Sequence, residues 1–473
     1  MSTPATPGTA GYSSTPFWFP TATPEWQPRP GLSIAEKFIL TEFGFQLALL
    51  VPQLNVGLLR VVWRTGAFAV SLALLALLRG KTRSNATTIG ALWVMALTVL
   101  EVFHPTSNTF LSAGAEAVMY IAILAPLFWM TRLRLDLRTF RRVILMFWGY
   151  FTLSSVVGIL QVEFPGRFQP QLSPVVASMG DAVEGLKIVL ASGKRVFRPM
   201  GLTDMPGGAA NAGMWAVLFG LGFLLATMPG RKRLWKQAVY AGSMMAGMIC
   251  IYLSQVRVLM VITLIWFVAL MGILLWRQRW RQLGKMALLV ILVVGGGLYT
   301  SLRVGGADLS KRLATLDGSG KTTSVYTGSR GYFLQQTIHE LIPDYPFGAG
   351  MGRWGMMNTY FGDNTDPNRK LIYVEIQWQG WVLDGGVPLV IAYLTLLWLT
   401  MVSLWRIARK RGPLWLWAAL CLAYDVGTIA SCFDFTPFTG EIGLEFWFIN
   451  ALVLSAAYCI ERQASAVPQM GWR

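Results

Sequence analysis

The sequence predicts an all-α, polytopic membrane protein. Of its 473 residues, 54% are hydrophobic and only 13% are charged, and the mean hydropathy is +0.50. Apolar runs of about 20 residues recur along the chain, which is the length that a helix needs to cross a bilayer. A soluble core requires no such series, so we expect a single integral membrane domain over residues 31–473.

The elements are expected in a simple order, a polar tail followed by spans. Residues 1–30 are rich in Thr, Pro, Ser and Gly and lack the basic segment and apolar core of a signal peptide, so we expect a disordered cytoplasmic tail. About twelve transmembrane helices then follow, at 38–57, 61–79, 87–103, 109–130, 143–162, 209–228, 237–255, 258–276, 286–303, 377–405, 414–433 and 442–460. The first is the weakest candidate, because it contains Glu42, Pro52 and Asn55.

The basic residues predict the orientation. The net charge is +17, from 40 Lys and Arg against 23 Asp and Glu. Many cations gather in short loops on one side, which is therefore expected to be cytoplasmic together with both termini; these loops are 79–83, 132–142, 231–236, 277–285 and 406–411. Two longer loops, about 163–208 and 304–376, then face outward, and the larger one, between the ninth and tenth spans, is expected to contain short helices. No basic face interleaved with exposed aromatic residues is visible, so we expect no nucleic-acid partner.

The residues that usually hold metals are sparse and scattered. The sequence has two histidines, His104 and His339, and no Cys-x-x-Cys pair. All four cysteines fall within apolar spans: Cys250, Cys421, Cys432 and Cys459. We therefore expect no metal site and no disulfide.

The large outward loop and its return to the membrane, residues 329–386, are the most patterned polar stretch of the chain. The spacing predicts a helix that begins at Arg330 and stops at Pro343, with apolar positions at Phe333, Ile338 and Leu341. The series GAGMG at 348–352 then predicts tight turns. A loop of this length is usually functional or disordered, and this one is too aromatic for disorder. It is the expected working surface of a membrane enzyme.

Three arginines on the outward side are exceptions to the charge rule. Arg257 lies in LSQVRVLM between two spans with scarcely any loop, Arg198 lies in RPMGL just before a span, and Arg330 opens the large loop. A cation at the lipid boundary is costly unless an anion or water meets it. Guanidinium groups bind phosphate oxygens bidentately, so three of them around one cavity would suit a diphosphate. The alternative is that each side chain extends to the lipid head groups.

A base would be needed if an acceptor hydroxyl attacks a sugar. Glu375 lies where the large loop re-enters the membrane, and Tyr373, Trp378 and Trp381 around it could stack on sugar rings. The alternative for Glu375 is a solvated interfacial charge. His339 and Asp384 are weaker candidates. Four acids within spans are either partners for polar helix faces or a proton path: Glu101, Glu116, Asp425 and Glu445.

Three of these segments resemble elements of the O-antigen ligase and O-antigen polymerase superfamily. The segments are LSQVR, GSRGYFLQQTIHELIPDYPFGAGMGRWG and VEIQWQGWVLDGGVPL, in the family's order. The resemblance covers roughly residues 195–400 and implies a bacterial membrane glycosyltransferase of the GT-C kind, without metal or other cofactor. Its donor would be a polyprenyl-diphosphate-linked glycan, used at the outer face of the inner membrane. A glycan or a lipid core would be the acceptor. Membrane lipids and polysaccharide assembly or chain-length proteins would be further partners.

The resemblance also implies roles for individual residues. Arg257 and Arg330 match the family's diphosphate-binding arginines, and Arg198 matches the arginine before the next span. The family's histidine base falls by spacing on Glu375, followed by Ile376 in place of Asn. Because ligases depend heavily on that histidine, the departure favours a polysaccharide polymerase over a ligase. The rival class is a transporter of a lipid-linked glycan or small solute, and a non-catalytic scaffold is a third reading. The polar residues are concentrated in one outward loop, and the other half of the chain has no matching loop. This asymmetry favours an enzyme over a transporter, which commonly has two corresponding halves.

Overall fold

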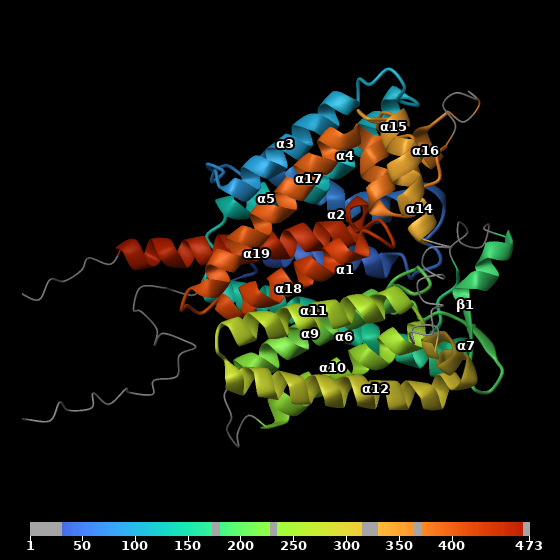
Figure 1. Cartoon of the computed structure of the whole chain (residues 1–473), viewed down its shortest axis with the longest axis vertical. Coiled ribbons are helices and arrows are strands. Elements are labelled where there is room, and N and C mark those ends of the chain that lie inside the picture. The colour runs from blue at the N-terminus through green and yellow to red at the C-terminus, as the bar shows by residue number, and fades with distance from the viewer. Residues whose placement is uncertain are drawn as a thin grey trace, which may run out of the picture.

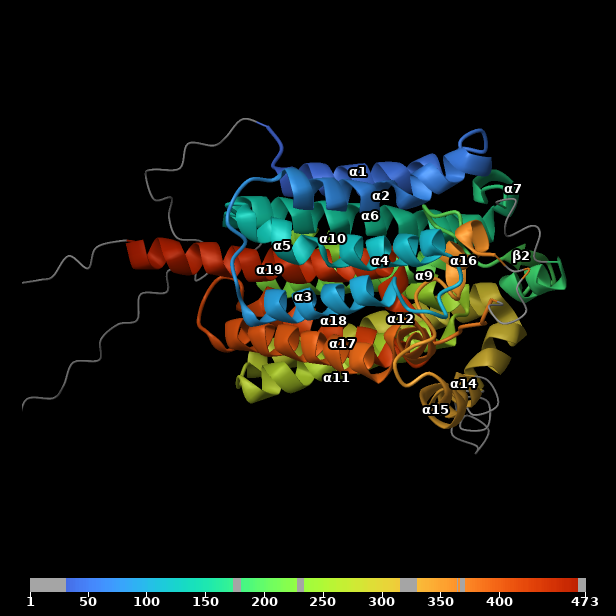
Figure 2. The same cartoon turned by 90° about the horizontal axis from the view of Figure 1, so that it is seen from above.

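The chain forms a bundle of long helices with most of its short elements gathered at one end (Figures 1 and 2). The computed structural model describes residues 31–172, 180–227, 234–314, 330–363, 365 and 371–466. The tail predicted at 1–30 lies outside these residues. The long helices are α1 (Ile34–Ala48), α2 (Gly57–Leu77), α3 (Ala86–Glu101), α4 (Phe110–Leu124), α6 (Leu137–Glu163), α9 (Gly208–Ala226), α10 (Leu234–Ser254), α11 (Arg257–Trp276), α12 (Trp280–Ala314), α17 (Gln377–Arg409), α18 (Trp415–Ser431) and α19 (Glu441–Ala466).

The short elements connect these helices. They are α5 (Pro126–Trp129), η1 (Met130–Arg132), α7 (Pro165–Phe168), η2 (Gly180–Leu186), β1 (Lys187–Val189), β2 (Arg195–Phe197), α14 (Arg330–Gln336), η4 (Thr337–Leu341), α15 (Ile342–Asp344), α16 (Gly355–Phe361) and η6 (Pro437–Thr439). The strands β1 and β2 form an antiparallel hairpin in which Ile188 pairs with Val196. Apart from this hairpin, the described residues confirm the predicted all-α class.

Nine helices in the described ranges are long and apolar enough to cross a membrane. Two other predicted spans correspond to the shorter apolar helices α3 and α18. The weakest predicted span, 38–57, overlaps α1, which begins at Ile34 and ends at Ala48, before Pro52. These helices support the multi-pass membrane class. Whether α1, α3 and α18 also cross the membrane, as the predicted count of about twelve spans requires, stays a prediction.

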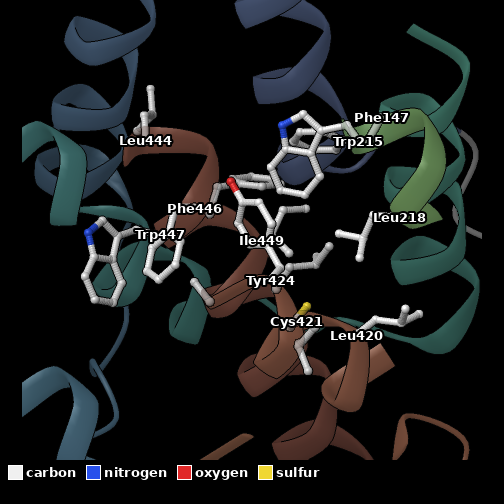
Figure 3. Packing of buried hydrophobic residues seen from close by; sticks show 14 of the residues in the cluster. Phe147, Trp215, Leu218, Leu420, Cys421, Tyr424, Leu444, Phe446, Trp447 and Ile449 are labelled. Atoms are coloured by element: carbon white, nitrogen blue, oxygen red, sulfur yellow. The ribbon is translucent and has the colours of Figure 1, made fainter. Parts of the chain in front are cut away.

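The core is aromatic and is centred on α9, whose apolar window is 83% buried inside the protein. A helix that is apolar on all sides is stable only when other helices surround it. Trp215 of α9 lies against Tyr424 of α18, with the ring centroids 4.4 Å apart (Figure 3). It also stacks on Phe219 of the same helix, at 5.1 Å. On another side of α9, the Cα of Gly213 approaches α10 so closely that an added Cβ would lie 2.6 Å from the carbonyl oxygen of Gly247. Small residues at such crossings allow the two backbones to pack tightly.

Both predicted long loops emerge at the same end of the bundle, which we call the loop end. The loop 163–208 lies between the end of α6 and the start of α9. α7, β2, α14, α15 and α16 all gather there in Figure 2. The described basic loops at 79–83, 132–142, 277–285 and 406–411 lie at the opposite end (Figure 2). For example, Arg277 donates to the carbonyl of Lys410 at 3.4 Å, and Arg83 lies over the ring of Tyr458. The bundle therefore has one basic end and one end with folded loops.

The helix predicted from Arg330 differs from its prediction in one respect. The chain passes through a π-helical turn, η4, and continues as α15 to Asp344 instead of stopping at Pro343. Proline is tolerated in the first turn of a helix, because the N–H that it lacks would have no partner there. Leu341 is buried as predicted, but Ile338 is 50% exposed.

Candidate functional site

Arg330 is the centre of a cluster of charged side chains at the loop end. It is the first residue of α14, and its Nη1 forms an ion pair with Oε2 of Glu375, just before α17. Its Nε lies 3.7 Å from Oδ1 of Asp434, in the segment between α18 and α19. The side chains of Arg330, Glu375 and Asp434 are 33%, 20% and 27% exposed. The cluster is therefore open to a ligand but shielded enough for strong electrostatic interactions.

Glu375 is held in place by groups on both sides. The hydroxyl of Tyr373 donates to Oε1 of Glu375. The backbone N–H of Glu375 donates to Oε1 of Gln379 at 3.0 Å, and the amide of Gln379 donates to Gln336 of α14 at 3.2 Å. This chain of hydrogen bonds ties the re-entry segment to the helix that carries Arg330.

Asp434 is placed by the first residue of α17. The backbone N–H of Gln377 lies 3.2 Å from the carbonyl oxygens of both Cys432 and Phe435. The side-chain oxygen of Gln377, in turn, accepts from the backbone N–H of Phe438 at 3.0 Å. These bonds fix the segment around Asp434 against the start of α17, beside Glu375.

The other two predicted arginines lie differently relative to this cluster. Arg257 begins α11 and lies close enough to Asp434 to stabilise its ionised form. Arg198 follows the β-hairpin, and its Nη2 donates to the carbonyl oxygen of Gly185 at 3.0 Å. A Cβ added to Gly207 would lie 3.9 Å from Cδ of Arg198 and 3.6 Å from Cγ2 of Val256. The side chains of Arg198 and Val256 thus both border Gly207, while the guanidinium of Arg198 contacts the segment before the hairpin.

We call Arg257, Arg330, Glu375 and Asp434 the loop-end cluster. Burial raises the pKa of Glu375 above its ordinary value, Arg330 opposes this shift and Asp434 adds to it. Burial also raises the pKa of Asp434, against the opposing effect of Arg330 and Arg257. A carboxylate whose pKa is raised is a stronger proton acceptor when it is ionised.

The three predicted sugar-contact residues have different environments. Tyr373 is 66% exposed, and Trp378 is half-buried with its ring 5.3 Å from that of Phe433. Trp381 is fully buried, and its ring stacks on Tyr393 with the centroids 4.6 Å apart. Trp381 therefore belongs to the core, and this position removes it from the side chains available to a sugar.

The two weaker candidates lie apart from the cluster. His339 is exposed on the π-helical turn η4. Asp384 is fully buried and accepts hydrogen bonds from the hydroxyl of Tyr120 and from Nε1 of Trp354, both at 2.7 Å. These contacts make Asp384 a link between α4, α17 and the large loop instead of an exposed acid.

The glycine turn of the large loop is docked into a break in α17. Gly386 has φ 62° and ψ −158°, and a Cβ there would lie 2.2 Å from the carbonyl oxygen of Pro346. The N–H of Val387 donates to that same carbonyl at 2.9 Å, and the N–H of Ala349 donates to the carbonyl of Leu383 at 2.7 Å. Gly348, Gly350 and Gly352 all have positive φ, as the predicted tight turns require. The loop thereby satisfies the backbone groups that the break in α17 releases.

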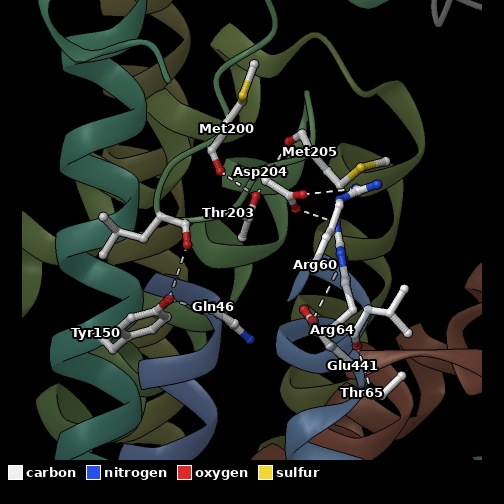
Figure 4. Close-up of polar contacts among 12 residues, drawn as sticks. Gln46, Arg60, Arg64, Thr65, Tyr150, Met200, Thr203, Asp204, Met205 and Glu441 are labelled. Carbon is white, nitrogen blue, oxygen red and sulfur yellow. Dashed lines mark hydrogen bonds and ion pairs between the residues drawn. The ribbon is translucent and has the colours of Figure 1, made fainter. Parts of the chain in front are cut away.

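A second polar group at the loop end was not predicted. Arg60 and Arg64 of α2 both bind Asp204, which precedes α9, and Arg64 also lies 3.7 Å from Oε1 of Glu441 (Figure 4). The Arg60–Asp204 contact is 3.0 Å, and the side chain of Asp204 is only 2% exposed. The available signal was two arginines at i and i+4 near the start of an apolar span, which lie on one face of a helix.

The fold and these clusters define a multi-pass α-helical membrane protein with structured loops at one end. No family model and no curated protein matches the chain. Among the described residues, no group of three or more His, Cys, Asp or Glu side chains is arranged to hold a metal ion.

Proposed function

We propose that this protein is a bacterial inner-membrane glycosyltransferase that uses a polyprenyl-diphosphate-linked glycan. In this proposal the loop end lies at the outer face of the membrane, where the reaction takes place. The observation that carries the proposal is the loop-end cluster. Two arginines from α11 and α14 lie with a candidate base on a partly open surface. Glu375 and Asp434 balance the charges of these arginines.

The proposed reaction is a single inverting displacement. An acceptor hydroxyl gives its proton to the carboxylate of Glu375, and its oxygen attacks the anomeric carbon of the donor sugar. The bond from that carbon to the diphosphate oxygen breaks, and the electron pair leaves with the diphosphate. Arg257 and Arg330 offset the charge that develops there, a task for which the guanidinium fork is well suited.

Donor binding would also prepare the base. Arg330 now lowers the pKa of Glu375 against the effect of burial. A diphosphate that binds Arg330 would weaken this ion pair, and the proton affinity of Glu375 would rise as the acceptor arrives. Arg198, which borders Gly207 as Val256 does, would extend the positive surface towards the hairpin.

The transporter alternative is favoured by one observation, the break in α17 at Gly385 and Gly386 next to the buried Asp384. Interrupted helices line the substrate sites of many transporters. Here, however, the broken backbone is bonded to the large loop through Pro346 and Ala349. A break that is closed by a docked loop supports a fixed enzyme scaffold better than a moving gate.

The test is release of polyprenyl diphosphate from a labelled lipid-linked glycan by purified protein in lipid nanodiscs. Arg330→Lys is expected to lower the rate about 100-fold or more, because loss of one preorganised donor costs about 2.7–4 kcal/mol. Arg303→Lys is the matched control, since Arg303 of α12 contacts Tyr299 instead of the cluster. A wild-type rate for Arg330→Lys would refute the proposal.

Two further measurements separate the parts of the proposal. Glu375→Gln is expected to lose transfer while still binding the donor, and full activity would remove Glu375 as the base but leave the arginine role intact. A polymerase, which we favour, lengthens the glycan on the polyprenyl carrier when no other acceptor is added. A ligase requires a lipid-core acceptor for any transfer.

A further inference from the structure

A long apolar groove opens between α2, α4 and α16. Its volume is about 500 Å³, within the range of about 300–1,000 Å³ of ligand pockets in proteins. The lining includes none of the four residues of the loop-end cluster. On α2, the wall of the groove runs along one helix face from Arg60 to Leu72. Met357 and Tyr360 of α16 line the groove where it reaches the loop end of the bundle. The groove is therefore a separate site from the loop-end cluster.

The dimensions of the groove fit one leaflet of a bilayer. The twelve residue-to-residue steps from Arg60 to Leu72 correspond to about 18 Å of helix, and half of the hydrocarbon core is about 15 Å. The candidate membrane window of α2 is only 22% buried inside the protein, so this helix borders the lipid. Val118, on the α4 wall, is 47% exposed. A lipid chain could thus enter from the side and lie along α2.

The loop end of the groove carries unused donors for an anion. Arg60 and Arg64 each give one nitrogen to Asp204, although each guanidinium has five N–H groups. The side chain of Arg60 is 9% exposed, and its buried Nε has no hydrogen-bond partner among the described residues. A buried cationic donor without a partner is costly. The side chain of Arg64 is the more open of the two, at 21% exposed, and its remaining N–H groups can donate to a phosphate oxygen.

We propose that this groove binds an anionic glycerophospholipid of the leaflet at the loop end, with one acyl chain along α2 and α4. Its phosphate would lie against Arg64 and Arg60. The local charge favours a phosphodiester over a diphosphate. Asp204 and Glu441 already offset the two arginines, so a ligand with one negative charge is tolerated better than one with two or more. The bound lipid is independent of the transfer reaction proposed above.

The test measures retained lipids on the purified full-length protein by native mass spectrometry. The protein is exchanged into mild detergent with equal amounts of phosphatidylglycerol and phosphatidylcholine. Wild type is expected to retain phosphatidylglycerol with about a tenfold preference. Both lipids carry the phosphodiester, but the quaternary ammonium of phosphatidylcholine adds a cation beside Arg60 and Arg64, and a tenfold ratio corresponds to about 1.4 kcal/mol. Arg64→Gln is expected to remove most of this preference.

Two variants fill the groove without altering its charges, Ala115→Phe on α4 and Ala69→Phe on α2. Each is expected to lose the retained lipid, and having two keeps the test valid if one does not fold. Leu92→Phe is the matched control, because Leu92 is 55% exposed on α3 and does not line the groove. It is expected to retain lipid like wild type.

Three results would overturn the proposal. These are equal retention of both phospholipids by wild type, full retention by a folded groove-filling variant, and displacement of phosphatidylglycerol by an equimolar amount of polyprenyl phosphate. The last result would identify a different occupant. Because the readout is bound lipid, a failure of glycosyl transfer would leave this test unaffected.

Discussion

Substitution of Gly386 by Ala tests how the large loop is attached to the membrane bundle. The new Cβ would lie 2.2 Å from the carbonyl oxygen of Pro346 and 2.6 Å from the backbone nitrogen of Gly348. Both contacts are with backbone atoms, which cannot rotate away as a flexible side chain can. We therefore expect the loop to separate from α17 and the site around Arg330 to loosen.

The expected loss in the free energy of unfolding has two contributions. The hydrogen bonds from Val387 to Pro346 and from Ala349 to Leu383 would be lost, at about 0.5–1.5 kcal/mol each. A residue other than glycine at φ 62° and ψ −158° adds about 1–3 kcal/mol of backbone strain. The expected loss is about 2–6 kcal/mol, a large part of the stability of a typical domain.

The assay is thermal unfolding in detergent, followed by tryptophan fluorescence, together with protease cleavage of the loop. Gly355→Ala is the control, because Gly355 also has a positive φ, 68°, but its Cβ would meet nothing within 4 Å. The control should show only the strain of the left-handed conformation, about 1–2 kcal/mol. If Gly386→Ala unfolds at the same temperature as Gly355→Ala and the loop stays protected from protease, the docking argument is refuted.

Three further predictions concern single side chains. The raised pKa of Glu375 means that the folded chain holds this proton to higher pH than the unfolded chain does. Its contribution to stability is full below the unfolded pKa of about 4.3 and is lost as the pH rises through the folded pKa. Unfolding midpoints from about pH 4 to about pH 8 should fall more in wild type than in Glu375→Gln, and parallel curves would contradict this. Asp384→Asn should keep wild-type stability, because its oxygen can accept from Trp354 while its amide donates to the hydroxyl of Tyr120. Asp384→Leu should lose about 1–3 kcal/mol for each orphaned donor in denaturant unfolding, and equal stability of the two variants would exclude the linking role. Trp381→Ala should lower the free energy of unfolding by about 3–5 kcal/mol, because the indole is fully buried. A much smaller loss would contradict that packing.

Local sequence patterns were sufficient to predict the all-α membrane class and many of the helices and turns. Apolar runs predicted the long helices, and the glycine series at 348–352 predicted the turns that have positive φ. The loop 163–208 begins and ends where hydropathy placed it. The predicted stop at Pro343 lies one residue before the end of α15 at Asp344, whereas the π-helical turn η4 before the proline was not predicted. Such a turn has no distinct signature in a single sequence.

The candidate site was predictable only in part. Arg330 and Glu375 were identified separately, from an arginine at a loop start and a carboxylate at a re-entry point. Their ion pair depends on hydrogen bonds through Gln379 and Gln336. Asp434 was missed because its place depends on backbone contacts between Gln377 and the segment before α19.

The sequence by itself determined a polytopic helical membrane protein with a patterned loop, because hydropathy and turn chemistry act over a few neighbouring residues. Only the tertiary structure decided which polar groups meet. It brought Arg330 to Glu375 and Asp434, placed Asp384 and Trp381 in the interior, and set Arg60 and Arg64 around Asp204. These partners are separated by up to 144 residues along the chain. Which of them meet is decided by how the helices pack and which buried polar groups must be satisfied, and neither is encoded in any short segment.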